Sequence, residues 1–154
     1  MTLLQVIKAI EGVAMRQPSV HMIVKNDVFR ISQAADVRYG VFAWLQRDHT
    51  SSIDSNVFSY QFTFFYVDLL RNDRANEVEI QSVGIQTLDN IIRTLDDLGL
   101  EVSGSYVMQP FNQRFADECA GVYCTVTLDA PLGSVCPEEF SDIDGEIDDD
   151  FLIF

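Results

Sequence analysis

Basic residues are scarce in this sequence, and lysine is the scarcest of them. The 154 residues include 24 aspartates and glutamates against 10 lysines and arginines, which gives a formal net charge of −14. Lys8 and Lys25 are the only lysines. Tight binding of nucleic acid depends on lysine and arginine side chains that neutralise phosphates. The composition therefore argues against tight nucleic-acid binding, and it fits a surface that DNA passes without sticking.

Two further absences concern disulfides and membranes. The three cysteines are odd in number and irregularly spaced, which argues against a disulfide framework and a zinc site: Cys119, Cys124 and Cys136. Cys119 and Cys124 are five positions apart, so a strand would place them on opposite faces. No apolar run reaches the length of about 18 residues that a membrane helix needs. The N-terminus lacks the basic start and unbroken apolar centre of a signal peptide, so we expect synthesis in the cytoplasm and no membrane association.

Sequence signatures of catalysis are missing as well. The chain contains no G-x-S-x-G, P-loop or G-x-G-x-x-G motif. His21 and His49 have no acid or nucleophile partner close in sequence. Asp68, Glu79 and Gln81 loosely resemble the acidic metal site of some nucleases, but Glu79 is explained more simply as part of a helix cap. We therefore expect no enzymatic activity, cofactor or metal.

What the sequence does contain is an alternating aromatic segment. Every second residue from Phe58 to Tyr66 is aromatic, which predicts a strand with one buried face. The opposite face begins with Ser59, Gln61 and Thr63, which can meet water or a partner. The apolar run over residues 57–70 exceeds the typical strand of about five or six residues. A strand of this length projects beyond its own domain, where another surface covers it.

The remaining pattern predicts an α+β fold: a mainly antiparallel sheet with a long hairpin, and two helices packed on one face. Thr2 and Gln5 have the spacing of a capping box, and Pro18 ends that first helix. Asn76 and Glu79 can cap the second helix, which Gly99 ends. The expected helices are 2–17 and 77–98, the expected strands are 20–25, 28–31, 41–47, 57–70, 101–108 and 120–128, and 109–118 is expected to be a loop.

Composition changes after residue 137, so we divide the chain into an α+β body (1–137) and an acidic C-terminal tail (138–154). Asp142 fails as the first ligand of a calcium loop, because Gly145 then stands at position four and Ile153 at position twelve. The apolar end, Phe151 to Phe154, either docks on a neighbour, in a groove or at a strand edge, or is a frayed end or one folded back on its own body. The tail's eight carboxylates repel DNA or assist docking: Glu138, Glu139, Asp142, Asp144, Glu146, Asp148, Asp149 and Asp150.

The order of elements resembles the bacteriophage tail-terminator or tail-completion family. The resemblance covers residues 1–130 and rests on a first helix, a long hairpin over 41–69, a helix over 77–98 and closing strands. It implies a structural virion protein, made in the host cytoplasm, that forms a ring at the head–tail junction. Its implied partners are copies of itself and portal, connector or tail proteins, while DNA passes through an acidic lumen without specific binding. The family has no catalytic residues, and the acidic extension is not one of its standard features.

For this ring connector we predict subunit or partner contacts at Ser59, Gln61 and Thr63 of the hairpin and at Phe151 and Phe154 of the tail. Two alternatives stay open. A small α+β ligand-binding or regulatory module would be a compact monomer or dimer with a defined pocket. A metal-dependent nuclease would need divalent ions and would lose activity in Asp68→Ala.

Overall fold

The computed structural model describes residues 1–33, 36–115, 117–131 and 152–153, and the fold they form is α+β. Within those residues no helix is long and apolar enough to cross a bilayer. The elements in chain order are α1 (Leu3–Met15), β1 (Met22–Lys25), the 3₁₀ helix η1 (Val28–Gln33), β2 (Val41–Ser51), β3 (Val57–Leu69), the short 3₁₀ helix η2 (Asn72–Arg74), α2 (Glu77–Asp97), β4 (Glu101–Val102), β5 (Gln109–Arg114), β6 (Glu118–Pro131) and β7 (Leu152–Ile153).

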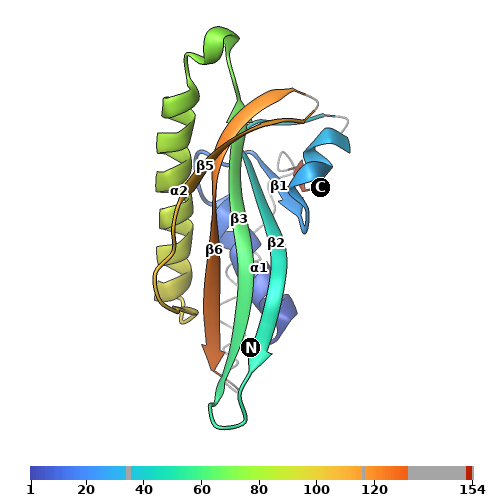
Figure 1. The fold of residues 1–154 in the computed structure, drawn as a ribbon. Helices are drawn as coiled ribbons and strands as arrows, with labels where there is room; N and C mark the ends of the chain where they lie inside the picture. The colour runs from blue at the N-terminus through green and yellow to red at the C-terminus, as the bar shows by residue number, and fades with distance from the viewer. Residues whose placement is uncertain (34–35, 116, 132–151, 154) are drawn as a thin grey trace.

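The strands form one mixed sheet that is mostly antiparallel (Figure 1). Its order is β4-β6-β3-β2-β1-β7, and β5 also pairs with β6. The centre is the long β3, which runs antiparallel to β2 on one side and to β6 on the other. The parallel part is confined to one edge, where β1 pairs with β2 and with β7.

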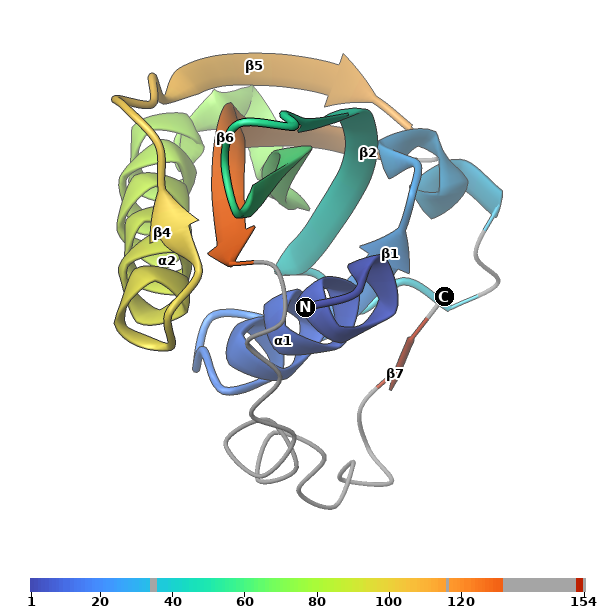
Figure 2. The ribbon, with the colours of Figure 1, turned by 90° about the horizontal axis from the view of Figure 1, so that it is seen from below.

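The aromatic side of β3 is the core, as its alternation predicts. Tyr60, Phe62, Phe64 and Tyr66 are at most 5% exposed. Buried residues of α1 and α2 join them in one apolar cluster, so both helices cover the same face of the sheet. In Figure 2 the strands lie between α1 on one side and β5 on the other, with α2 beside β6.

Helix α1 begins and ends as the sequence predicts. The Thr2 hydroxyl accepts a hydrogen bond from the Gln5 N–H, and the Gln5 side chain accepts one from the Thr2 N–H. These reciprocal bonds satisfy donors that a helix start otherwise leaves free. On the buried side, the Trp44 indole donates to Glu11, and Lys25 pairs with the same carboxylate at 3.3 Å. Glu11 therefore connects α1 to both β1 and β2.

Helix α2 packs unusually close to the sheet, and Gly84 permits it. A Cβ at position 84 would lie 2.2 Å from Val122 Cγ2 and 2.9 Å from Tyr66 Cδ1. The helix ends at Gly99, whose φ of 92° is in the left-handed region that glycine adopts freely. The Leu100 N–H then bonds Leu95 O and the Gly99 N–H bonds Asp96 O, which is the Schellman arrangement.

The predicted cap of α2 is partly wrong. Asn76 stands at the helix start, but its side chain does not cap the helix. It accepts instead from the Arg71 N–H at 2.8 Å and donates to Leu69 O at 3.0 Å. Asn76 thus fixes the turn between β3 and α2, which the spacing with Glu79 could not reveal.

The second short strand, expected over 28–31, is also wrong, because this segment forms η1. The Asp27 carboxylate accepts the Phe29 N–H at 2.9 Å and so begins a tight turn. Val28 and Ile31 are three positions apart and both are buried. They pack on the second face of the sheet with residues of β1, β2, β3 and β6.

The expected strand over 101–108 shrinks to β4, and the expected loop over 109–118 contains β5. β4 leaves the sheet after Val102, before Gly104, whose φ is 72°. Pro110 suggested a loop, but proline is tolerated in an edge strand, where one side needs no ladder hydrogen bond. β5 is such a strand, since β6 is its only partner among the described strands.

Candidate subunit interface

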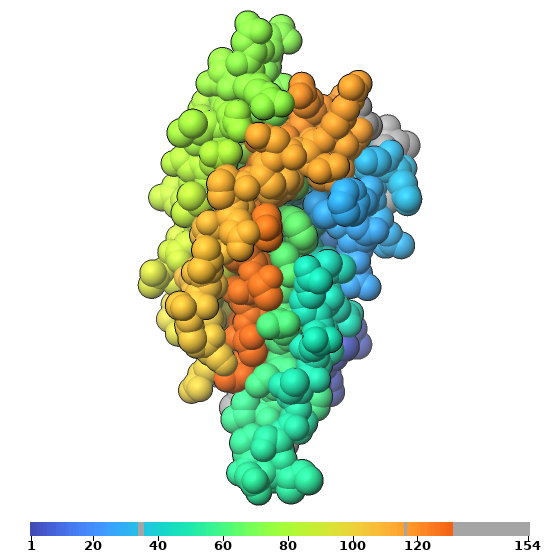
Figure 3. All heavy atoms as spheres, viewed as in Figure 1, coloured from blue at the N-terminus to red at the C-terminus, as the bar shows by residue number. Residues whose placement is uncertain are grey.

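The hairpin of β2 and β3 extends beyond the helices at one end of the molecule (Figures 1 and 3). The strands remain paired as far as Ser51 and Phe58, and β6 accompanies β3 down to Val57. At the tip, Ile53 is fully exposed, at 105% of its reference area. A fully exposed isoleucine adds nothing to the core of its own fold, so its side chain is free to contact another surface.

Next to the tip, the sheet face opposite α1 and α2 is polar and open. Figure 3 shows β2, β3 and β6 at the surface below the crossing of β5. Ser59 lies opposite Asp129 and donates to it at 2.5 Å, and Gln61 lies opposite Thr127. Ser59 and Gln61 are half-buried and remain available at the surface, as predicted for contact residues. Their contact with a subunit stays a prediction.

Thr63 does not share this availability. Its hydroxyl accepts from Arg47 Nε at 2.9 Å and lies 3.0 Å from the Thr125 hydroxyl. The Arg47 side chain covers it, so Thr63 is only 1% exposed. The alternation placed Thr63 on the correct face but could not show that a neighbouring strand supplies a long side chain above it. Arg47 replaces Thr63 as the exposed group at this position.

Further along the same face, aromatic residues form a shallow groove that the sequence did not predict. Phe65 stacks on Tyr123 at 5.8 Å between ring centroids and meets Phe111 edge-on at 6.3 Å. Phe29 of η1 meets Phe115 edge-on at the groove's far side. The groove has a volume of about 290 Å³, and only Asp27 and Arg47 bring charge to its lining. The sequence predicted a loop over 109–118 where the structure has β5. It therefore gave no reason to place Phe111 on the sheet beside Phe65 and Tyr123.

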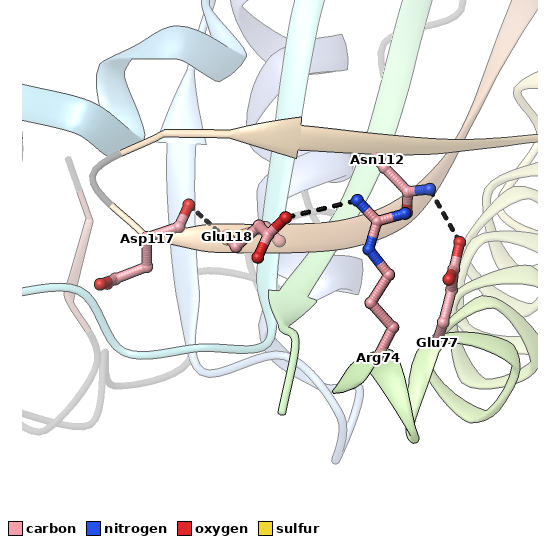
Figure 4. Close-up of polar contacts among 6 residues, drawn as sticks. Arg74, Glu77, Asn112, Asp117 and Glu118 are labelled. Carbon is pink, nitrogen blue, oxygen red and sulfur yellow. Dashed lines mark hydrogen bonds and ion pairs between the residues drawn. The ribbon is translucent and has the colours of Figure 1, made fainter. Parts of the chain in front are cut away.

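The opposite end of the molecule is held by polar contacts around the β3–α2 turn (Figure 4). Asp73 and Arg74 adopt left-handed φ values of 64° and 55°. Arg74 pairs with Glu118 at 3.3 Å, and the Asn112 side chain donates to Glu77 at 2.8 Å. These contacts join the turn and α2 to β5 and β6. Because the charges are exposed and already paired, we interpret the cluster as structural.

The two cysteines within the described residues are buried. Cys119 and Cys124 are buried on opposite faces of β6, as their spacing predicts. Burial raises the pKa of Cys119 to about 11 and that of Cys124 to about 12. Reactive cysteines have lowered pKa values and exposed sulfur atoms, so neither thiol suits catalysis.

The other candidate ligands are not assembled into a site. His21 Nδ1 lies 2.8 Å from Tyr39 O, and the His49 ring packs against Tyr60 and Phe62. The Asp68 carboxylate accepts the neighbouring Leu69 N–H, while Glu79 is exposed on α2. Over the described part of the chain, no group of three His, Cys, Asp or Glu side chains is arranged to hold a metal.

The tail predictions fall mostly outside the described residues. This applies to the contacts at Phe151 and Phe154, to Cys136 and to the eight carboxylates from Glu138 to Asp150. Between the two phenylalanines, the backbone of β7 pairs with β1 of the same chain. The backbone pairing of Leu152 and Ile153 with β1 of the same chain corresponds to the fold-back alternative.

Comparison with known proteins shows no family for this chain. No protein-family model matches the chain, and no curated protein matches it. Its function is therefore argued from the hairpin, the open face and the charge.

Proposed function

We propose that this protein is a structural subunit that forms a ring at the head–tail junction of a bacteriophage, as a connector or tail-completion protein. The observation that carries the proposal is the hairpin of β2 and β3, which extends past the body and ends in the fully exposed Ile53. A protruding hairpin with an apolar tip serves assembly better than it serves a soluble enzyme.

The placement of the two proposed contact surfaces supports a ring. The hairpin tip lies at one end of the molecule, and the open face around Ser59 and Gln61 lies along its side. A tip that contacts a different patch of the next subunit makes a heterologous contact, and such contacts close into rings when the rotation allows. Identical subunits would then each offer one tip and accept one.

Charge supports the passage of DNA through such a ring. The second half of α2 and the start of β4 carry Asp89, Asp96, Asp97 and Glu101 against one base, Arg93. The net charge of −14 means that the chain as a whole repels phosphate. We propose that an acidic face of this kind lines the lumen, where DNA slides without specific binding.

Within the virion, the partners of the ring would be the proteins above and below it. These are portal, connector or tail proteins, and the subunit would be made in the host cytoplasm before it joins the particle. No catalytic step and no cofactor enter this proposal, since its mechanism is assembly.

Electron microscopy of the purified full chain in negative stain tests the proposal. We expect closed rings of one diameter, and we expect Ile53→Ser to abolish them while leaving the fold intact by circular dichroism. Separate globular particles of monomer size in the wild-type preparation, like those expected of Ile53→Ser, would contradict the proposal. In an electrophoretic mobility-shift assay at physiological salt, adding the ring should leave the mobility of duplex DNA unchanged.

A ligand-binding module is the second candidate, because the aromatic groove offers an apolar surface with one cation, Arg47, and one anion, Asp27. Its volume of about 290 Å³ lies at the lower limit of ligand pockets, which span roughly 300–1,000 Å³. A binding module would stay monomeric and would gain thermal stability with an aromatic carboxylate such as benzoate. Leu45 also lines the groove, and Leu45→Asp would remove that gain.

A further inference from the structure

The edges of this sheet differ in how well they are protected against pairing with another strand. Exposed edges are usually blunted by charges, proline or bulges. Beyond Trp44, β2 has no partner on its outer side among the described residues, but it carries Arg47, Asp48 and a bulge between Gln46 and His49. Asn26 also accepts the Gln46 N–H at 3.1 Å. β5 carries Pro110 among polar, exposed side chains, so both edges are defended.

Over Met22–Val24, β1 has none of these defences, and its one charged residue is the last, Lys25, which pairs with Glu11 of α1. Met22, Ile23 and Val24 are uncharged, and each is 0% exposed. Met22 and Val24 belong to the cluster on one face and Ile23 to the core on the other, so the strand is buried on both faces like an interior strand. An interior-type strand at an edge requires a further strand beside it.

The main chain of β1 is also set to receive that strand. The His21 N–H donates to Gly40 O, which extends from the start of β2, at 2.8 Å. Because successive residues of a strand direct their main-chain groups to opposite sides, those of Met22 and Val24 point away from β2. β7 occupies this side in parallel register, with Leu152 opposite Met22 and Ile153 opposite Ile23.

We propose that the outer edge of β1 is a strand-addition site, and that in the assembled ring its occupant is the Leu152–Ile153 segment of a second copy of this chain. The inference rests on the proposed self-assembly and deepens it by naming the acceptor and the donor. The pairing seen within one chain shows that this segment fits this edge. In exchange between copies the same two residues pair with the same edge, so the contact itself is unchanged.

Chain length permits the exchange. Twenty residues, 132–151, separate β6 from β7. Fully extended, a segment of twenty residues reaches at most about 70 Å, so its length allows pairing with an adjacent subunit. Within one chain, pairing over only two residues must offset the entropy cost of closing this loop. In a ring, the segment of a neighbouring copy is also held at a high effective concentration, so it competes with the chain's own segment for the same edge.

Isotope-coded photo-cross-linking of the full chain tests this exchange. One preparation is unlabelled and the other carries nitrogen-15, and both have benzoylphenylalanine in place of Leu152. The two are mixed in denaturant, refolded together and irradiated. Mass spectrometry then identifies cross-links between position 152 and peptides that contain Met22 and Ile23. We expect about half of these cross-links in the oligomer to join a light peptide to a heavy one.

A matched pair of variants gives a second measurement. Ile153→Pro removes a main-chain N–H from the added strand, whereas Ile153→Val keeps it. We expect Ile153→Pro to raise the dissociation constant of the oligomer, measured by light scattering, at least tenfold. Ile153→Val should have the dissociation constant of the wild type.

The outcomes separate this inference from the proposed function. An oligomer whose cross-links join only peptides of one isotope, or one that Ile153→Pro leaves unchanged, overturns the exchange while the ring stands. A chain that remains monomeric in every preparation overturns both.

Discussion

At the scale of single residues, Gly84 decides how closely α2 approaches the sheet. Replacing glycine with alanine inside a helix ordinarily stabilises it by about 0.5–1 kcal/mol. Here the new methyl group would collide with Val122 and Tyr66. Because a buried overlap of this kind costs about 1–3 kcal/mol, we expect Gly84→Ala to lower the free energy of unfolding in urea. Ser82→Ala, an exposed position of the same helix, is the control and should change it little.

Glu11 presents a second test at this scale. It is 7% exposed, and it accepts the indole N–H of Trp44 at 3.0 Å. Glu11→Leu leaves that buried donor without a partner, which costs about 1–3 kcal/mol. Glu11→Gln keeps an acceptor and should cost less. Trp44 is the only tryptophan, so its fluorescence during urea unfolding reports both values. An equal decrease in the free energy of unfolding in Glu11→Leu and Glu11→Gln would contradict a role for the hydrogen bond from the Trp44 indole.

The Asp89 carboxylate links stability to pH. Hydrogen bonds from Tyr106 first, and then from Arg93, lower the pKa of Asp89. A lowered pKa adds stability that is present above the unfolded value of 3.8 and is lost as pH falls through the folded value. We therefore expect the stability difference between wild type and Asp89→Asn to be constant from about pH 7 to 5 and to shrink towards pH 3. Urea titrations at these pH values measure it, and a constant difference down to pH 3 would contradict the linkage.

At the scale of elements, local periodicity identified what local chemistry determines. Alternating aromatics identified β3, the Thr2–Gln5 spacing identified the start of α1, and Gly99 identified the end of α2. The elements that the sequence did not predict are those whose structure depends on contacts with segments far along the chain. β5 forms because β6 offers an edge, and that pairing overrides the loop signal of Pro110.

The hairpin is the element on which assembly depends. Ile53 has no contacts to lose in the monomer, so Ile53→Ser should leave the free energy of unfolding within about 0.5 kcal/mol of the wild type. We expect the same change to weaken self-association at least tenfold by analytical ultracentrifugation. Val107→Ser removes another exposed apolar side chain, 66% exposed and away from the hairpin, and is the matched control. Equal effects of the two variants on association would contradict a specific role for the tip.

At the scale of the whole molecule, the sequence indicated the fold class and the acidic charge but only part of the candidate interface. Ser59 and Gln61 lie on the open face as predicted, whereas Thr63 is covered because Arg47 reaches across from β2. The undefended edge of β1 was also hidden, since its burial depends on η1, both helices and the returning β7. Properties of a surface depend on which segments meet, and residue patterns along one segment do not record that.

Self-assembly is the central claim, and native mass spectrometry of the full chain at increasing concentration tests it most directly. If the subunits assemble as proposed, a single closed oligomer of fixed copy number replaces the monomer as the protein concentration rises. A spectrum that shows only the 17.4 kDa monomer at every concentration would contradict it.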